Sequence, residues 1–166
     1  MTVPSLILRL EPLPENAAGG SPPSTALRAV VDLDDSEPTT SPLARWSAAS
    51  AAAHDPCLVL DRDGAIVSIS AAAADLLGCS DAGVIGRQLL DVIDVVDFET
   101  GSPNPDYAAR ITPLAVLDGQ GLSRSVLRVR HPDDALVTVD TASASVHDAA
   151  GSVVGSVSFL ASVGSA

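Results

Sequence analysis

The sequence contains no lysine and very few aromatic residues. Its nine basic residues are all arginine, against 21 acidic residues, and the formal net charge is −12. Proteins that bind nucleic acids neutralise phosphates with a basic surface and often stack aromatic rings on bases. The acidic balance and the aromatic content of 2% therefore argue against a nucleic-acid partner. An acidic surface of this kind is typical of a cytoplasmic protein.

Long apolar runs and cysteines are also scarce. No apolar run approaches the roughly 18 residues that cross a membrane, and the N-terminus lacks the charged start and long apolar stretch of a signal peptide. The sequence therefore predicts neither membrane attachment nor secretion. Cys57 and Cys79 have no metal-type spacing, and we expect two reduced thiols. The hydrophobic content of 46% supports a core, which must be aliphatic.

Residues that could catalyse a reaction are few. No Gly-x-Ser-x-Gly motif occurs, and we expect no enzyme activity. Three histidines flank predicted turns or strand ends and are interpreted as surface residues: His54, His131 and His147. Three carboxylates recur at every third position, at Asp91, Asp94 and Asp97, and could bind a divalent cation. The spacing of a calcium-binding loop is absent, so we interpret them as a solvated face. No metal site is predicted.

The N-terminal part, residues 1–40, is an extension rich in Pro, Gly and Ser with two short β-like runs, near 6–8 and 26–33. One interpretation is a disordered tail. The other is a strand pair that docks on the domain or on a partner. The sequence leaves both open.

A helix is predicted in the flanking segment 41–55. Ser41 can cap it and Pro42 suits its first turn. Leu43 and Trp46 lie near one face of this helix. Trp46, the only tryptophan, either packs over the protein's own sheet or anchors a dimer, because tryptophan is enriched at interface hot spots. Leu43 and Trp46 are the predicted interface residues.

The most informative stretch begins with an apolar strand at 57–60. Residues 61–64 form an Asp-x-Asp-Gly turn, and a second strand follows at 65–69. Ser70 then caps a short helix that ends at Gly78. The predicted order is strand, tight turn, strand and helix.

Two further helices are expected in the middle of the chain. The first helix is predicted over Gly86 to Ile93. Ile85, Leu89 and Ile93, spaced four residues apart, are expected to point inward. After a loop over 99–106, a helix is predicted at 112–118, with a cap near Thr112. Three strands joined by turns complete the chain, at 122–130, 135–147 and 152–163.

These motifs, in this order, resemble the PAS domain family, the sensor and interaction modules of bacterial signalling. The resemblance rests on Asp61-Arg62-Asp63-Gly64, on Leu76-Leu77-Gly78, and on Ile85-Gly86 followed by Leu89-Leu90. The chain departs from the family in two places: Ser70-Ala71 replaces the usual Asn, and the turn at 131–134 contains Pro. The resemblance implies an α+β fold, a five-stranded antiparallel sheet with short helices on one face, over residues 56–163.

The resemblance also implies a function. We expect a stand-alone cytoplasmic signalling module that acts by protein association, as a homodimer or with a signalling protein. The alternative is a small-molecule or cofactor sensor whose aliphatic pocket is lined by Ile85, Leu89, Leu127, Val139 and Phe159. No cofactor is predicted: residues 99–121 contain no His or Cys for a haem, and the Asn-Cys-Arg motif of covalent flavin sensors is absent.

Overall fold

The computed structural model describes residues 8–12, 27–31, 40–79, 81–119 and 121–164. They belong to two compact units, divided between Thr39 and Thr40. In the first unit, β1 (Leu8–Pro12) pairs with β2 (Leu27–Val31) in an antiparallel hairpin. The two β-like runs of the extension therefore pair with each other. The linker near 15–25 lies outside the described residues.

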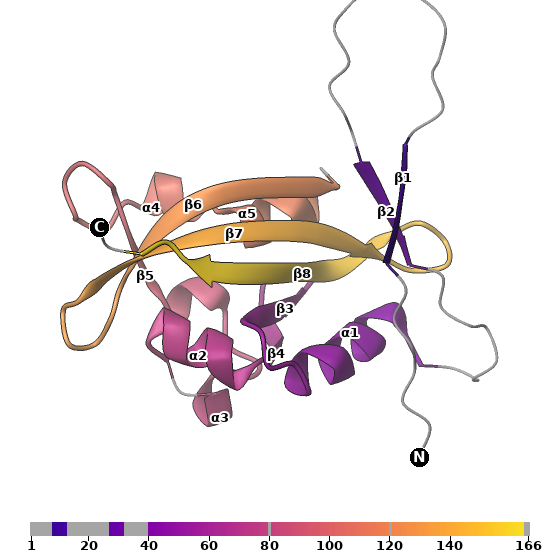
Figure 1. The fold of residues 1–166 in the computed structure, drawn as a ribbon, viewed down its shortest axis with the longest axis horizontal. Coiled ribbons are helices and arrows are strands. Elements are labelled where there is room, and N and C mark those ends of the chain that lie inside the picture. Colours follow the sequence, from indigo (N-terminus) through magenta and orange to yellow (C-terminus); the bar gives the residue numbers. More distant parts are fainter. Residues whose placement is uncertain (1–7, 13–26, 32–39, 80, 120, 165–166) are drawn as a thin grey trace, which may run out of the picture. The chain divides into compact units, whose positions relative to one another are not determined.

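The second unit is built on one antiparallel sheet of six strands in the order β4-β3-β8-β7-β6-β5 (Figure 1). The strands are β3 (Cys57–Asp61), β4 (Ile66–Ile69), β5 (Asp94–Val96), β6 (Leu122–Arg130), β7 (Leu136–His147) and β8 (Val153–Ser162). Five of them are the predicted strands, so the predicted architecture is confirmed with one addition. The additional strand is β5, which pairs with the end of β6.

The helix predicted over residues 86–93 does not form as a whole, and Gly86 is the reason; strand β5 begins directly after this segment, at Asp94. The φ of Gly86, 82°, lies in the left-handed region, so a helix cannot run through it. Its N–H bonds to the Ile66 carbonyl at 2.8 Å, which holds this segment along β4. Only the short 3₁₀ turn η1 (Leu89–Asp91) remains of the helix. Ile85 is therefore 53% exposed, whereas Leu89 and Ile93 are buried as expected.

The stretch from β3 to α2 (Ala71–Leu77) folds as predicted. The Asp61 carboxylate accepts hydrogen bonds from two N–H groups of the turn, which closes the β3–β4 hairpin. The Ser70 hydroxyl accepts from Ala73 N–H as the helix cap and also from Cys57 N–H at 3.0 Å. One side chain thus fixes the start of α2 against β3.

The predicted helix at 112–118 is a short α-helix, α5 (Thr112–Ala115), followed by the 3₁₀ turn η2 (Val116–Asp118). Ile111, not Thr112, stands in its N-cap position. The Thr112 hydroxyl instead bonds to the Ser125 hydroxyl on β6. Upstream, α4 (Pro105–Ala108) is capped by Asn104.

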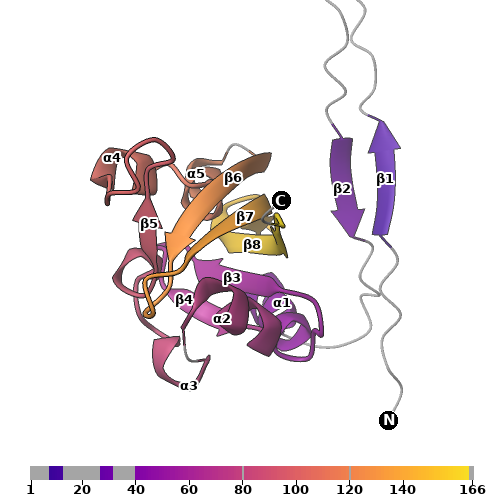
Figure 2. The ribbon, with the colours of Figure 1, turned by 60° about the vertical axis from the view of Figure 1, so that its left-hand side comes forward.

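The two faces of the sheet are covered differently (Figure 2). The face toward α2, α3 (Asp81–Val84), η1 and α5, here called the inner face, carries the main aliphatic core. The opposite face, here called the outer face, carries a smaller cluster under α1 (Pro42–Ala51), in which Leu43 and Trp46 pack near Cys57 and Val157. Among the described residues no helix is both long and apolar enough to span a bilayer.

Candidate functional site

Three of the five residues predicted to line an interior pocket lie together in the core. Leu89, Leu127 and Val139 belong to the cluster on the inner face and are at most 1% exposed. Ile85 lies outside this cluster because Gly86 turns the chain. Phe159 lies on the outer face, because it neighbours the inward-facing Leu160 on β8 and successive side chains of a strand point to opposite faces.

The centre of the inner face is lined with hydroxyl groups that sequence reasoning missed. Ser143 and Ser158 bond to each other at 2.7 Å, and Ser156 donates to the Pro113 carbonyl at 2.8 Å. The hydroxyl of Thr141 is fully buried, with no hydrogen-bond partner among the described residues. The alternation of Ser and Thr along β7 and β8 is the signal that could have located this group. The interior is therefore more polar than the predicted aliphatic pocket.

The outer face holds the predicted interface residues. The Trp46 ring of α1 meets the Phe159 ring of β8 edge-on, with centroids 6.4 Å apart. Trp46 is half-buried against the sheet, and Phe159 is 48% exposed. The chain has one Trp, one Tyr and two Phe, so half of its aromatic residues gather at this one exposed place. Trp46 therefore packs on the protein's own sheet and also remains accessible to a second chain, so neither of the two roles considered for it is excluded.

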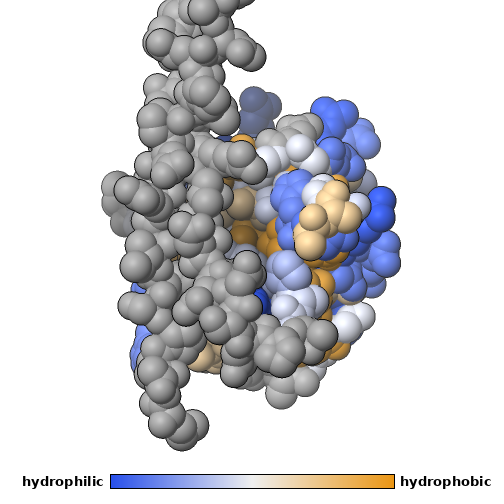
Figure 3. Space-filling view, turned by 90° about the vertical axis from the view of Figure 1, so that its right-hand side faces the viewer, coloured by the Kyte–Doolittle hydropathy of each residue, from blue (hydrophilic) through white to orange (hydrophobic). Residues whose placement is uncertain are grey.

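Beside the aromatic pair, an ion pair crosses the outer face. Arg124 on β6 donates to both carboxylate oxygens of Asp140 on β7, with the Nε–Oδ1 distance at 2.9 Å. The hydrogen bonds and the arginine's charge lower the pKa of the Asp140 carboxyl. A shallow hollow of about 220 Å³ runs between this pair, Ala142 and Phe159. Figure 3 shows, on one side of the molecule, hydrophobic residues bordered by hydrophilic ones.

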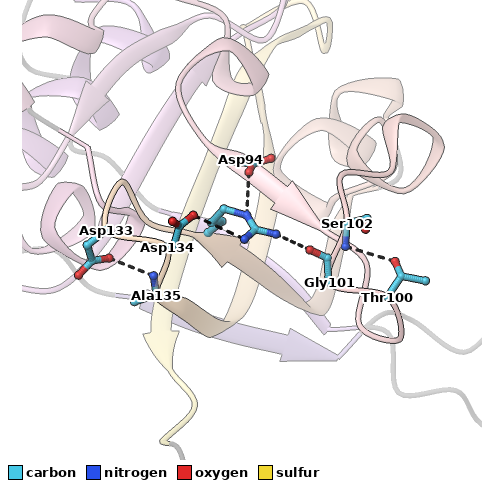
Figure 4. A network of polar contacts seen from close by, with 8 residues as sticks. Asp94, Thr100, Gly101, Ser102, Asp133, Asp134 and Ala135 are labelled. Atoms are coloured by element: carbon cyan, nitrogen blue, oxygen red, sulfur yellow. Dashed lines mark hydrogen bonds and ion pairs between the residues drawn. The ribbon is translucent and has the colours of Figure 1, made fainter.

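A second polar cluster centres on Arg130 at the end of β6. Figure 4 labels its partners Asp94, Asp134 and Gly101. The Arg130 guanidinium contacts Asp94 of β5 at 3.3 Å and Asp134 of the next turn at 3.7 Å, and donates to the Gly101 carbonyl. A hollow of about 310 Å³ lies beside it, bounded in part by His131. Because Arg130 joins one strand and two turns, the cluster stabilises this end of the sheet.

The three carboxylates considered for a cation have separate roles. The Asp97 carboxylate accepts from the N–H groups of Thr100 and Glu99, and these bonds lower its pKa. Asp94 pairs with Arg130, and Asp91 is exposed. Within the described ranges, no group of three or more potential metal ligands is placed to hold an ion.

The histidines are dispersed over turns. The Nε2 atom of His131 lies 2.9 Å from the Leu76 carbonyl oxygen, and Nδ1 of His147 lies 3.1 Å from that of Gly151. His54 is exposed just before β3. These contacts join turns to neighbouring backbone, and none of them presents a base to a serine or cysteine nucleophile.

We expect the stability of the domain to fall at alkaline pH because of Cys57. Burial raises the pKa of this thiol above its ordinary value of 9.0. As the pH rises through 9.0, the thiol ionises in the unfolded chain before it ionises in the folded one, so unfolding is favoured. Chemical denaturation at pH 8 and pH 10 should show a smaller loss in Cys57→Ala than in the wild type. An equal loss in both proteins would contradict this assignment. Burial also raises the pKa of the Tyr107 hydroxyl. Tyr107→Phe therefore measures the part of the alkaline loss of stability that comes from this residue and not from Cys57.

The family model described as "PAS fold" matches residues 44–160. No curated protein matches the chain. Among solved structures, a PAS domain from Colwellia psychrerythraea is 17% identical with a TM-score of 0.54, covering 73% of this chain and 96% of that one.

Two further structures have the same fold. The LOV protein of Rhodobacter sphaeroides is 13% identical with a TM-score of 0.57, covering 74% of this chain and 67% of that one. The light-state dimer of the fungal blue-light photoreceptor Vivid is 18% identical with a TM-score of 0.51, covering 64% and 76%. The family match spans most of the chain and agrees with the observed sheet and helices. The chain therefore belongs to the PAS family, whose members are generally sensor and signalling modules.

Proposed function

We propose that this domain transmits a signal by associating with another protein chain through α1 and the outer face of its sheet, most simply with a second copy of itself. The observation that carries this proposal is the exposed aromatic pair, Trp46 and Phe159. Large aromatic side chains with accessible surface are the residues that most often dominate protein interfaces.

The surroundings of this pair support the proposal. On the same face, Leu122, Val126 and Val163 are each more than 40% exposed, so apolar surface extends from β6 to β8. The Arg124–Asp140 pair lies among them and can give an interface its orientation. The fungal photoreceptor Vivid, which shares this fold, forms a dimer in its light state. A self-complementary face of this kind suits a two-fold dimer.

Sedimentation equilibrium tests the proposal. We expect the wild type to self-associate and Phe159→Ser to weaken the association by at least about tenfold, because an aromatic hot spot contributes 1.4 kcal/mol or more. Trp46→Ala should weaken it as well. Ile85→Ser is the matched control, because Ile85 is equally exposed but lies away from this face. A wild type that stays monomeric, or variants that associate as the wild type does, would contradict the proposal.

A second function, small-molecule sensing, is favoured by the buried hydroxyls of the inner face. A fully buried hydroxyl without a partner, like that of Thr141, calls for a water or ligand group to bond it. No ionised side chain belongs to the buried residues around it, so the matching ligand is small, neutral and able to hydrogen-bond. Native mass spectrometry of freshly purified protein should then show a stoichiometric adduct. A clean apo mass would leave association as the sole function proposed.

The effect of Thr141→Val on the stability of the domain shows whether the Thr141 hydroxyl is unbonded or is bonded by a water or a ligand. If no group bonds the hydroxyl, Thr141→Val removes a buried unpaired donor at little change of shape and should stabilise the domain by about 1 kcal/mol. Ser143→Ala is the control in the same strand: it leaves Ser158 without its partner and should destabilise by a similar amount. Thermal denaturation measures both. A destabilised Thr141→Val would show that water or a ligand occupies the site.

A further inference from the structure

Part of one edge of the sheet is open, at the start of β6, whereas Ile66 on β4 and the end of β5 bond to other backbone segments of the chain. Along β4, Ile66 exchanges hydrogen bonds with the segment 86–87. Along β5, Asp97 N–H bonds to the Ser102 carbonyl and Val96 bridges to Pro103. Strand β6, however, pairs with β5 only over its last residues, 128–130. Over 122–127 its sole strand partner among the described residues is β7.

On this open edge, the backbone groups of the even-numbered residues point away from β7. The Gly121 carbonyl accepts from Ser145 N–H, so odd-numbered residues direct their backbone groups toward β7. The Val126 carbonyl accepts the Tyr107 hydroxyl instead, on the other side. Because backbone direction alternates along an antiparallel strand, Leu122 and Arg124 present their N–H and C=O groups outward, and Val126 presents its N–H. Unpaired groups in a row are a template for another strand.

The side chains along this edge define what would bind. On the outer face Leu122 and Val126, 58% and 43% exposed, flank Arg124. Strand β6 has three arginines and no acidic residue in a chain of net charge −12. Arg124 is already paired with Asp140, but its side chain is 73% exposed and can accept a second carboxylate. Two copies paired antiparallel about Arg124 would bring these two arginines together, which disfavours self-pairing in that register.

We propose that the open edge of β6, residues 122–126, binds an extended segment of a partner protein as an added antiparallel strand. The segment has the alternating pattern apolar–x–acidic–x–apolar. Main-chain hydrogen bonds to Leu122, Arg124 and Val126 would hold it, and its acidic residue would lie beside Arg124. The hydrogen-bonding groups of this site lie on β6, whereas Phe159 lies on β8, so Phe159→Ser should leave them intact.

Amide hydrogen exchange by NMR tests the proposal on the full chain, with the blocked peptide Thr-Leu-Thr-Glu-Thr-Val-Thr as the probe. At about 1 mM peptide, we expect exchange at the Leu122, Arg124 and Val126 amides to slow at least about fivefold. The amides of Ser123 and Ser125, which face β7, should change little. The peptide with Lys in place of Glu should protect less.

Two variants distinguish backbone pairing from charge attraction. Arg124→Pro removes an outward N–H that the folded sheet does not use, a position where an edge strand tolerates proline, and should abolish protection at Leu122. Arg124→Gln keeps the N–H and should retain protection while losing the preference for Glu over Lys. No slowing with any peptide would overturn the proposal. Protection of these amides that rises with protein concentration in the Phe159→Ser variant, without peptide, would also overturn it, because a second copy would then occupy the edge.

Discussion

Replacing Gly155 with alanine is expected to lower the free energy of unfolding by about 3 kcal/mol, the upper range for an overpacked core. Gly155 lies on β8 between Asp61 of β3 and Val146 of β7. A Cβ at this position would overlap the Leu60 carbonyl oxygen and approach Leu43 Cδ1 to 2.6 Å. The carbonyl belongs to the paired backbone of β3 and cannot move aside without disturbing the sheet.

Chemical and thermal denaturation measure this effect, and Gly83→Ala is the matched control. No atom lies within 4 Å of a Cβ added at Gly83, which is in helix α3. Alanine is the better helix former, so the control should be neutral or stabilising by up to about 1 kcal/mol. A Gly155→Ala variant as stable as this control would show that α1 and β3 do not approach β8 as closely as described.

The second large effect is expected for Leu127→Ala. Leu127 is 1% exposed and packs in the main core on the inner face of β6. Removing its side chain loses the transfer free energy of the deleted groups and leaves a cavity, which together cost about 3 kcal/mol. Urea denaturation gives the change in unfolding free energy directly.

Leu122→Ala is the control on the same strand. Leu122 is 58% exposed on the outer face, so its truncation should change the unfolding free energy by less than about 0.5 kcal/mol. The comparison tests the orientation of β6. Equal losses in the two variants would contradict it, because one face of the strand must be buried and the other exposed.

Local signals in the sequence predicted the opening of the domain well. The Asp61–Gly64 turn, the Ser70 cap and the end of α2 at Gly78 each depend on residues within a few positions of one another. Such interactions can be read from a sequence because they need no knowledge of the rest of the fold. The long strands β6, β7 and β8 were predicted for a similar reason, their alternating pattern.

The parts that were not predicted depend on distant contacts. The backbone of Gly86 pairs with β4, and of the helix expected over residues 86–93 only the short 3₁₀ turn η1 forms. Phe159 was expected inside, but its face depends on the register between β8 and β7, in which it lies opposite Ala142. A shift of one residue reverses every side chain, and the sequence does not specify that register.

The candidate site was predicted in the same uneven way. Leu89, Leu127 and Val139 were expected in the interior and lie there together, because apolar residues are buried wherever the fold allows. The buried hydroxyls were missed, because serine and threonine are ordinarily exposed. Hydrogen bonds to distant parts of the fold make their burial favourable, as between Ser143 and Ser158 or from Ser156 to the Pro113 carbonyl.

The peptide groups of Cys57 join the two sides of the domain. Its carbonyl accepts from the Ser50 hydroxyl of α1 on the outer side, and its N–H donates to Ser70, the cap of α2 on the inner side. Ser70 N–H also bonds to the same carbonyl at 2.9 Å. The position of α1 and the start of α2 therefore depend on the backbone groups of the same residue, Cys57, although the two helices lie on opposite faces of the sheet.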